Sequence, residues 1–542
     1  MFSGLMFKQA APSYPAGSFV FQVKTDNAGT STSTQFKYPT ISGGSYNCTV
    51  YWGDGTTSTI TTYNDAAWTH TYSSAGTYTI YITGTKTGIF FNGSGDRLKL
   101  LNISQWGTFN PGNSGNWFNG CANLTITATD APSLTSVTTM NAAFQDTSSL
   151  TGIPGIGSWN VSSIGSFASC FSGSAFNSSI NSWTISSATS MASMFQNNTS
   201  YNQSMSSWTL PSSLATMNAM LSGCTSFNSG IAWTFASTVD IRSLLAGCTS
   251  YNQNPFVWGG LSNITSFTDL LNGCSSYNQA TTGINNATAV TTATRTFKDC
   301  VAFNQSLSAW SPTGVTNAAS MLSGCTAFNS ALPTFGTSLV TATSFLLNAS
   351  SFNQSLSTIN TTNVLSFSSF LEGATAFNHS SISSLKTGSS TNFTHMFRNA
   401  SSLNQSLTSG GSGTWQTGLA SIFTGMFEGA SSFNQSLSSW DVTFGSDFNN
   451  MFKNATSFNQ NLNAWTASSV TTAAGMFDGV TLSTANYNAL LDMWYANVGN
   501  TDVVFSGGNS KYDSTSGGYD GATARADLIA SWTWTITDGG HA

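Results

Sequence analysis

Apolar and polar positions recur along this chain in two different patterns. Near the N-terminus, residues 18–23 and 77–82 alternate with a period of two, which predicts half-buried strands. From residue 118 onward a unit of about twenty-five residues recurs, and residues 303–310 show its clearest form, F-N-Q-S-L-S-A-W. A fixed period of this length predicts a stacked solenoid, in which each unit buries its apolar face only against its neighbours.

The two patterns divide the chain into five parts. We expect an N-terminal docking segment (1–16), a small all-β domain (17–90), a connector (91–117), about fourteen repeats (118–480) and a C-terminal cap (481–542). The cap differs from the repeats because residues 487–494 and 524–529 have helical spacing and residues 532–536 resemble a strand. The predicted fold class is therefore mainly β, with a repeat solenoid and a small α+β cap that covers its last core face.

Equivalent positions of successive repeats stack about 5 Å apart in such an array, so that each position forms a column. Two columns are aromatic, and we interpret both as core rather than as a platform for sugars. The Trp column contains Ile284, Phe335 and Ile359, which a sugar platform would tolerate poorly. A third column is nearly all Asn, and we predict a buried ladder that satisfies backbone groups, each of which would cost roughly 1–3 kcal/mol if unpaired.

Cysteine occupies one repeat position six times and is replaced there by Ala in later repeats. A position that accepts both Cys and Ala requires a small buried apolar group, so we predict reduced cysteines rather than disulfides or a metal site. We expect no metal and no cofactor.

Two further columns are candidate sites. The Gln column is a candidate set of exposed polar contacts and equally a self-satisfied ladder; its members are Gln203, Gln253, Gln305, Gln354, Gln405 and Gln435. A charged column alternates in sign over five successive repeats: Glu372, Arg398, Glu428, Lys453 and Asp478. We predict that it forms inter-repeat ion pairs on the outer face, which specify register more than they add stability.

Composition excludes several classes of protein. Only 6% of residues are charged and the net charge is -6, against about 25% charged residues in ordinary soluble proteins. We therefore expect no nucleic-acid partner, and no apolar stretch is long enough to predict membrane insertion. No nucleophile elbow, P-loop or dinucleotide motif is present. We expect no catalytic residues, although neighbouring repeats could bring Asp269 and Asp299 together, as a polysaccharide hydrolase or lyase would need.

Two resemblances to known families rest on particular motifs. Residues 51–57, Y-W-G-D-G-T-T, and residues 69–78 resemble the PKD family of immunoglobulin-like β-sandwiches, which implies a rigid spacer or contact module. The repeats, for example M-F-E-G-A-S-S-F-N-Q-S-L at 426–437, resemble the bacterial-surface leucine-rich-repeat family typified by BspA. This resemblance covers about two thirds of the chain and implies surface or adhesion proteins.

These observations predict a non-enzymatic extracellular binding or adhesion protein. The N-terminus lacks a secretory signal, so our first choice is a phage virion appendage, a fibre or capsid-surface protein that contacts a glycan or protein on the host surface. Its N-terminus would dock on a virion or cell-surface scaffold through Phe2, Leu5, Met6 and Phe7. The alternatives are a secreted BspA-like bacterial surface adhesin whose signal was removed, and a self-assembling filament or decoration subunit, a homo-oligomer joined at strand edges of imperfect caps.

Overall fold

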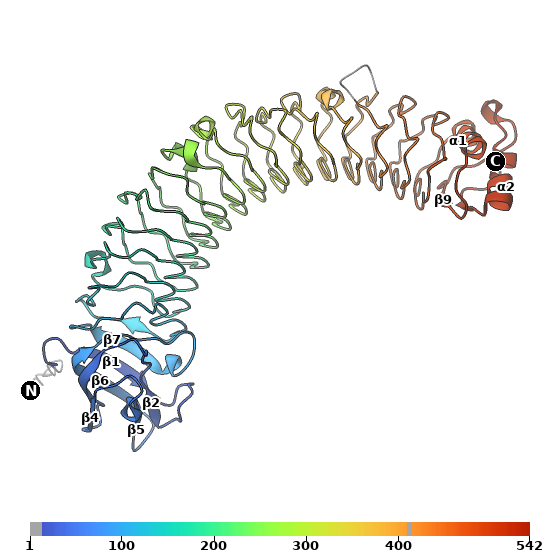
Figure 1. Cartoon of the computed structure of the whole chain (residues 1–542). Helices are drawn as coiled ribbons and strands as arrows, with labels where there is room; N and C mark the ends of the chain where they lie inside the picture. The colour runs from blue at the N-terminus through green and yellow to red at the C-terminus, as the bar shows by residue number, and fades with distance from the viewer. Residues whose placement is uncertain (1–12, 409–414) are drawn as a thin grey trace, which may run out of the picture. The chain divides into compact units, whose positions relative to one another are not determined.

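Turns, rather than helices or long strands, make up most of this protein in the computed structural model, which describes residues 13–408 and 415–542. Figure 1 shows strands gathered near the N-terminus, turn-rich repeats in the middle of the chain, and the helices α1 and α2 near the C-terminus. The chain divides into two compact units, Met1–Ser237 and Thr238–Ala542. The protein is therefore mainly non-helical and has few strands.

The first unit begins with a β domain of two sheets. Its larger sheet has six strands in the order β4-β3-β6-β1-β7-β8. These strands are β1 (Phe19–Lys24), β3 (Tyr46–Tyr51), β4 (Thr57–Ile60), β6 (Thr77–Lys86), β7 (Leu100–Gln105) and β8 (Thr125–Ile126). All neighbours are antiparallel except β7 and β8, which are parallel, and a second, antiparallel sheet pairs β2 (Gln35–Lys37) with β5 (Thr69–Thr71).

The sheet does not end at residue 90. Strand β7 lies within the predicted connector and pairs with β1, and β8 lies in the first repeats. Between the sheets, Trp52 and Tyr72 are 1% and 3% exposed, and the Tyr72 hydroxyl donates to the Trp52 carbonyl at 3.1 Å. Trp52 therefore lies in the core, and Tyr72 ties the chain beside β5 to the end of β3.

Each repeat contains three overlapping β-turns. In one repeat, N–H groups close the turns Phe167–Cys170, Ser169–Ser172 and Phe171–Ser174 at 3.1, 3.1 and 3.3 Å. The third residue of the first and last turns has a positive φ, 55° at Ser169 and 65° at Gly173. This left-handed conformation is most accessible to Gly, Asn and Asp, which explains why those three residue types fill the second of these positions along the array.

Neighbouring repeats are joined by backbone hydrogen bonds between equivalent positions. The N–H groups of Phe167, Ser169 and Phe171 donate to carbonyls one repeat later at 2.9, 2.9 and 2.8 Å. Isolated parallel bridges join Thr139 to Ser166 and Ser166 to Ser190, and similar bridges recur in the second unit. Alternate N–H groups in each run of turns are thus satisfied by the next repeat, as the backbone of a buried segment requires.

The aromatic columns form the core of the repeats, as predicted. Phe303, Phe328 and Phe352 are all 0% exposed, and their successive ring centroids lie 5.6 and 5.9 Å apart in parallel planes. The eight cysteines are buried and unpaired. The thiols of Cys274, Cys300 and Cys325 each contact a carbonyl oxygen at 2.9–3.1 Å.

Short 3-10 helices interrupt the turns. Three lie outside the repeats: η1 (Ala66–Trp68), η2 (Arg97–Lys99) and η8 (Ser516–Gly518). In the described part of the repeats there are five: η3 (Ile156–Ser158), η4 (Pro255–Val257), η5 (Leu261–Asn263), η6 (Ile284–Asn286) and η7 (Ser380–Ser384).

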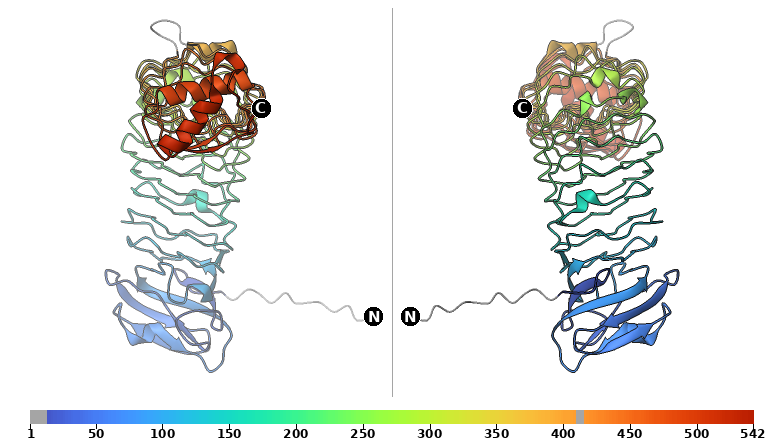
Figure 2. Two further views of the ribbon diagram at one scale, coloured as in Figure 1. Left: turned by 90° about the vertical axis from the view of Figure 1, so that its right-hand side faces the viewer. Right: turned by 90° about the vertical axis from the view of Figure 1, so that its left-hand side faces the viewer.

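The C-terminal segment covers the last repeat. It contains α1 (Thr484–Ala496), β9 (Val504–Ser506), α2 (Gly521–Trp532) and β10 (Thr535–Thr537). The two helices pack against each other (Figure 2), and β9 pairs in parallel with β10. The N–H groups of Ala473 and Phe477 donate to carbonyls of β9 at 2.8 and 3.1 Å, so the strand edge that would support self-assembly is paired. No helix among the described residues has the length and apolarity to span a membrane.

Candidate functional site: amide rows and a depression between repeats

The Asn column lies on the surface of the repeats. Each of these residues follows a fully buried aromatic or Leu residue, yet its own side chain is exposed or half-buried. The members are Asn177, Asn202, Asn228, Asn252, Asn278, Asn304, Asn329, Asn353, Asn378, Asn404, Asn434 and Asn459. The prediction of a ladder is confirmed, but its predicted burial is wrong, because the backbone groups that it satisfies also lie at the surface.

Where the next repeat has Gln after its Asn, the Asn side chain holds two groups of that repeat. The Asn329 Oδ1 atom accepts the N–H group of Asn353 at 2.9 Å and the Nε2 group of Gln354 at 2.9 Å. The same pair of bonds recurs in the repeats of Gln203, Gln305, Gln405 and Gln435, with Nε2–Oδ1 distances of 2.9–3.0 Å. The remaining predicted member, Gln253, occupies the same position and is half-buried.

The predicted Gln column is therefore a ladder whose donors are used within the protein. What it leaves at the surface is a set of second groups: one Asn Nδ2 donor per repeat, and a Gln Oε1 acceptor in those repeats that have Gln after the Asn. Because the inter-repeat bonds fix the side chains, a ligand that contacts these groups would not have to order them on binding. Residues 203–435 can therefore offer a pre-ordered, uncharged hydrogen-bonding surface within each unit.

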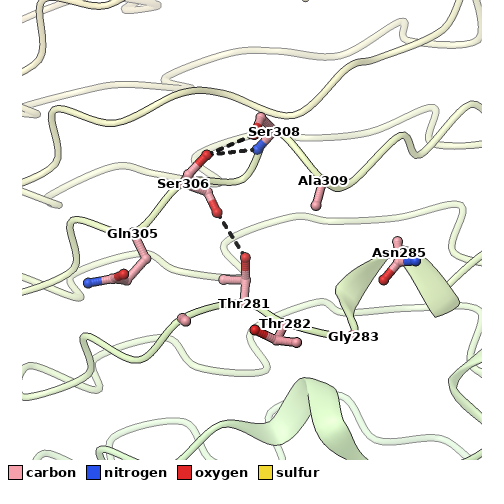
Figure 3. Close-up of a pocket in the computed structure, with 9 residues that line it drawn as sticks. Thr281, Thr282, Gly283, Asn285, Gln305, Ser306, Ser308 and Ala309 are labelled. Carbon is pink, nitrogen blue, oxygen red and sulfur yellow. Dashed lines mark hydrogen bonds between the residues drawn. The ribbon is translucent and has the colours of Figure 1, made fainter.

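One of the repeats that depart from the pattern leaves a depression beside this row (Figure 3). Where the clearest repeats have Ser-Leu-Ser-x-Trp, residues 280–284 are Ala-Thr-Thr-Gly-Ile. The smaller side chains leave a volume of about 410 Å³, lined by residues 280–283, Asn285, Gln305, Ser306, Ser308 and Ala309. Gly283 is required here, because its φ is 95° and a Cβ atom would lie 2.2 Å from the Phe256 carbonyl oxygen.

The walls of the depression are polar and uncharged. The Thr281 hydroxyl donates to the Ser306 carbonyl at 2.9 Å, and the Ser306 and Ser308 hydroxyls lie 2.9 Å apart (Figure 3). The side chains of Thr282 and Asn285 stand on the opposite wall and make no hydrogen bond with a described residue. Buried charge without a counter-charge is costly, so this lining favours a neutral ligand with hydroxyl or amide groups.

The charged column forms one of its predicted ion pairs. Arg398 donates to Glu372 through Nε at 2.8 Å, and the Glu372 side chain is only 10% exposed. Among the described residues, neither Glu428 nor Lys453 has an ion-pair partner within 4.0 Å. Asp478 accepts a hydrogen bond from the Ser506 hydroxyl of the cap instead. The charged column thus links one pair of adjacent repeats by an ion pair and does not form a continuous series of ion pairs.

A second inter-repeat ion pair lies at the repeat position three residues before the charged column. Arg295 binds both carboxylate oxygens of Asp269 at 2.7 Å, while Asp299 is bound by Lys298 at 2.5 Å. The two carboxylates considered for a hydrolase are therefore each held by a cation. Opposite charges at one position of adjacent repeats were visible in the sequence and are the signal by which Asp269 and Arg295 could have been paired.

Nearby, His395 stands in a left-handed turn position, with a φ of 56°. Burial and the charge of Arg398 lower the pKa of His395, against the opposing effect of Glu372 and Glu428. The predicted docking residues Phe2, Leu5, Met6 and Phe7 lie outside the described residues.

Comparison with known proteins gives one match. A family model described as "Mycoplasma protein of unknown function, DUF285" matches residues 113–233, 239–348, 325–411 and 409–516. No curated protein and no solved structure matches the chain. The matched ranges cover the repeats and extend into the C-terminal segment, which together make up more than half of the sequence. The chain therefore belongs to the DUF285 family.

Proposed function

We propose that this protein is a non-enzymatic binding protein that acts outside the cell and contacts a host surface through its repeats. The observation that carries the proposal is the amide row, in which inter-repeat hydrogen bonds hold the Asn side chains and, where a Gln follows the Asn, the Gln side chain in place. A pre-ordered row of identical groups suits a long or repetitive partner, since each repeat adds a contact without a further ordering cost.

We also propose the finer fold assignment. The repeats form a solenoid of the leucine-rich-like, BspA-like kind, and residues 17–90 form a PKD-like sandwich. The parallel bridges between equivalent positions support the first assignment. The two facing sheets and the hydrogen bond from Tyr72 to Trp52 support the second.

The partner is a glycan or a protein displayed on the host. A neutral glycan fits the site better, because the lining of the depression carries hydroxyls and amides and no charged side chain. An extended peptide that adds a strand needs unpaired backbone groups, and alternate N–H groups in these repeats are already used by the next repeat.

Our first candidate for the particle that displays the protein is a virion, on which residues 1–16 would dock the chain. The second candidate is a bacterial cell surface, with the chain acting as a BspA-like adhesin. The description of the family as a Mycoplasma protein favours this second candidate. The proposal of a self-assembling filament is weaker, because N–H groups at the last described edge of the repeats already donate to carbonyls of β9.

The test distinguishes a loss of binding from a loss of folding stability. Asn→Asp substitutions at Asn304, Asn329 and Asn353 retain the Oδ1 acceptors but remove the Nδ2 donors. We expect the labelled triple variant to lose most binding to intact host cells in flow cytometry while it melts like the native chain. The charge-matched control places Asp at three exposed sites outside the row, Val301, Val340 and Leu365. Equal binding by the two triple variants would refute a role for the amide row.

A further inference from the structure

The residue that follows each Asn of the amide row alternates from repeat to repeat. In every second repeat this residue is Gln: Gln203, Gln253, Gln305, Gln354, Gln405 and Gln460. The repeats between them vary at this position: Ser178, Ser229, Gln279, Ser330, His379 and Gln435. Because Ser, His and Gln all occupy the intervening position, folding of a repeat does not require Gln there. The row therefore has a period of two repeats that the repeat structure alone does not explain.

Ser and Gln bind the preceding Asn in the same way but leave different groups at the surface. The Ser330 hydroxyl donates to Asn304 Oδ1 at 2.9 Å, and the Gln354 Nε2 group donates to Asn329 Oδ1 at 2.9 Å. Gln also carries the carbonyl acceptor Oε1 at the end of a longer side chain, which Ser lacks. The alternation thus changes the acceptors at the surface and keeps the bonds that join the repeats.

In the second unit, alternate repeats leave the same two groups unused. Four Gln Nε2 groups donate to Asn Oδ1 atoms of the preceding repeat at 2.8–3.0 Å: Gln305 to Asn278, Gln354 to Asn329, Gln405 to Asn378 and Gln460 to Asn434. The Nδ2 and Oε1 atoms of these side chains make no hydrogen bond with a described residue, and the side chains are exposed or half-buried. Each alternate repeat thus presents one held donor and one held acceptor.

The spacing of the row limits the shape of a repetitive ligand. Parallel bridges join equivalent positions of adjacent repeats, for example Asn317 and Thr341, and such strands lie about 5 Å apart. The ring centroids of Phe303, Phe328 and Phe352, which directly precede the row, lie 5.6 and 5.9 Å apart. A ligand that follows the row must advance by about this distance per unit and present equivalent groups at every second unit.

A glycan of 1→4-linked β-pyranoses has both properties. Its linkage bonds are equatorial, so the chain is extended and advances by a similar distance per sugar. Successive sugars are rotated by about half a turn, so one side of the chain presents the same groups at every second sugar. Its hydroxyl or acetamido groups can both accept from Asn Nδ2 and donate to Gln Oε1.

We propose that the amide row binds an extended, neutral glycan of 1→4-linked β-pyranoses, with one sugar on each repeat and equivalent contacts at every second repeat. This inference rests on the proposed function and narrows its class of partner. The glycan is either unsubstituted or N-acetylated, since both forms have the same linkage. An α-1→4-linked glycan coils and cannot keep one sugar on each repeat.

Calorimetric titration of the full chain with three hexasaccharides tests the linkage. Cellohexaose and N-acetylchitohexaose are β-1→4-linked, without and with acetamido groups, so these two arms distinguish the two sources. Maltohexaose contains the same sugar as cellohexaose in α linkage and is the matched control. We expect saturable binding of at least one β-linked hexasaccharide, and binding of maltohexaose weaker by about tenfold or more, since it reaches fewer repeats. Failure of both β-linked hexasaccharides to bind, or equal affinity for maltohexaose, would overturn the proposal.

Two double variants test the period of two repeats. Gln354→Ser with Gln405→Ser removes acceptors from alternate repeats, and Gln279→Ser with Gln435→Ser removes the same number from intervening ones. Both variants should melt like the native chain, because Ser keeps the bond to Asn in native repeats. The first should bind the β-linked hexasaccharide more weakly by roughly tenfold, as expected for two lost hydrogen bonds, and the second should stay within about twofold. Equal losses in the two variants would overturn the proposed contacts.

The length of the glycan gives a second readout of the same period. A trisaccharide and a pentasaccharide each add a sugar on a further Gln repeat, whereas a tetrasaccharide and a hexasaccharide add one between them. Affinity should therefore rise by about threefold or more at the first two lengths, the value of one hydrogen bond, and less at the other two. Equal increments at every length would contradict the alternation.

Failure of this inference is distinguishable from failure of the proposed function. If the native chain binds host cells and the Asn→Asp triple variant does not, while neither β-linked hexasaccharide binds, the row has a different partner. The proposed function then stands, and only the assignment of the glycan is wrong.

Discussion

Backbone conformation at two residues per repeat explains much of the residue choice in the array. The later position, for example Gly324 with a φ of 73° or Asn348 with a φ of 58°, is always Gly, Asn or Asp. The earlier position also accepts Ser, Ala, His and Arg, although these residues occupy the left-handed region at a cost. Apolar periodicity alone does not reveal these positions, because it records burial and not φ.

Gly324 and Ser320 provide a matched test of this strain within one repeat. Gly324→Ala should lower the free energy of unfolding by about 1–2 kcal/mol, since Ala is strained at this φ and its Cβ atom would lie 2.1 Å from Asp299 Oδ1. Ser320→Gly relieves strain at a φ of 53° but adds freedom to the unfolded chain, so the change should stay within about 0.5 kcal/mol. Denaturant titration measures both, and equal effects would contradict this account.

Single residues also show where prediction from the sequence ends. Lys86 is 3% exposed and its Nζ atom has no hydrogen-bond partner among the described residues, whereas the Nζ atom of the buried Lys99 donates to three carbonyls. Nothing in the sequence around the two lysines separates them, because the isolation of Lys86 depends on where Phe19 and Cys48 lie in the folded domain. The depression at residues 280–309 has a partial signal, since Ala280, Gly283 and Ile284 break the consensus of the repeat.

The amide row links repeats through a single acceptor atom per Asn. Asn329→Ala removes the acceptor for the Asn353 N–H group and for Gln354 Nε2. We expect a loss of about 1 kcal/mol, measured by denaturant titration.

Asn329→Asp is the matched control, because it keeps an oxygen at the same place. Its stability should stay within about 0.5 kcal/mol of the native value at neutral pH. If the Ala and Asp variants are equally destabilised, the hydrogen bonds do not carry the effect.

The ion pair between Glu372 and Arg398 ties together two repeats in the C-terminal half. Arg398→Glu places a like charge beside the mostly buried Glu372 side chain. We expect a loss of about 1–3 kcal/mol, between the values for exposed and buried pairs, and this loss should shrink as salt screens the repulsion. Thermal melts at low and high salt measure it.

Lys453→Gln is the comparison at the same position of a repeat that has no ion pair among the described residues, because it places no like charge beside Glu428 and Asp478. Its melting temperature should change little at either salt concentration. Indistinguishable melts for Arg398→Glu and the native chain would remove the ion pair as a device that fixes register.

Across the molecule, the sequence predicts which apolar positions are buried. It does not predict which polar side chains are exposed or how charged side chains pair. The period, the buried aromatic columns and the Trp52–Tyr72 core follow from residue type, because a buried position restricts size and polarity. The exposure of the Asn column could not be predicted from residue type, because an Asn that binds backbone groups can lie either at the surface or in the core. Among the described residues, only one ion pair forms in the charged column. Pairing depends on how far each side chain reaches, which the spacing of the repeat does not determine.

The cap should keep the molecule monomeric at its C-terminal end. A chain that ends at residue 480 exposes the N–H groups of Ala473 and Phe477, which now donate to β9, together with the apolar face of the last repeat. Because an unpaired edge is a template for pairing with another chain, we expect this truncated chain to self-associate. Light scattering after size exclusion measures its mass, and a monodisperse monomer would contradict the role given to β9.

The way in which β9 closes the array bears on how such a protein can evolve. Its carbonyls accept from Ala473 and Phe477 as those of another repeat would, so the same cap can follow any repeat with a similar sequence. Duplication or loss of one repeat by recombination then changes the reach of the protein in steps of about 5 Å and leaves both ends intact. Selection can thus adjust the length of the row of Asn and Gln side chains without changing its chemistry.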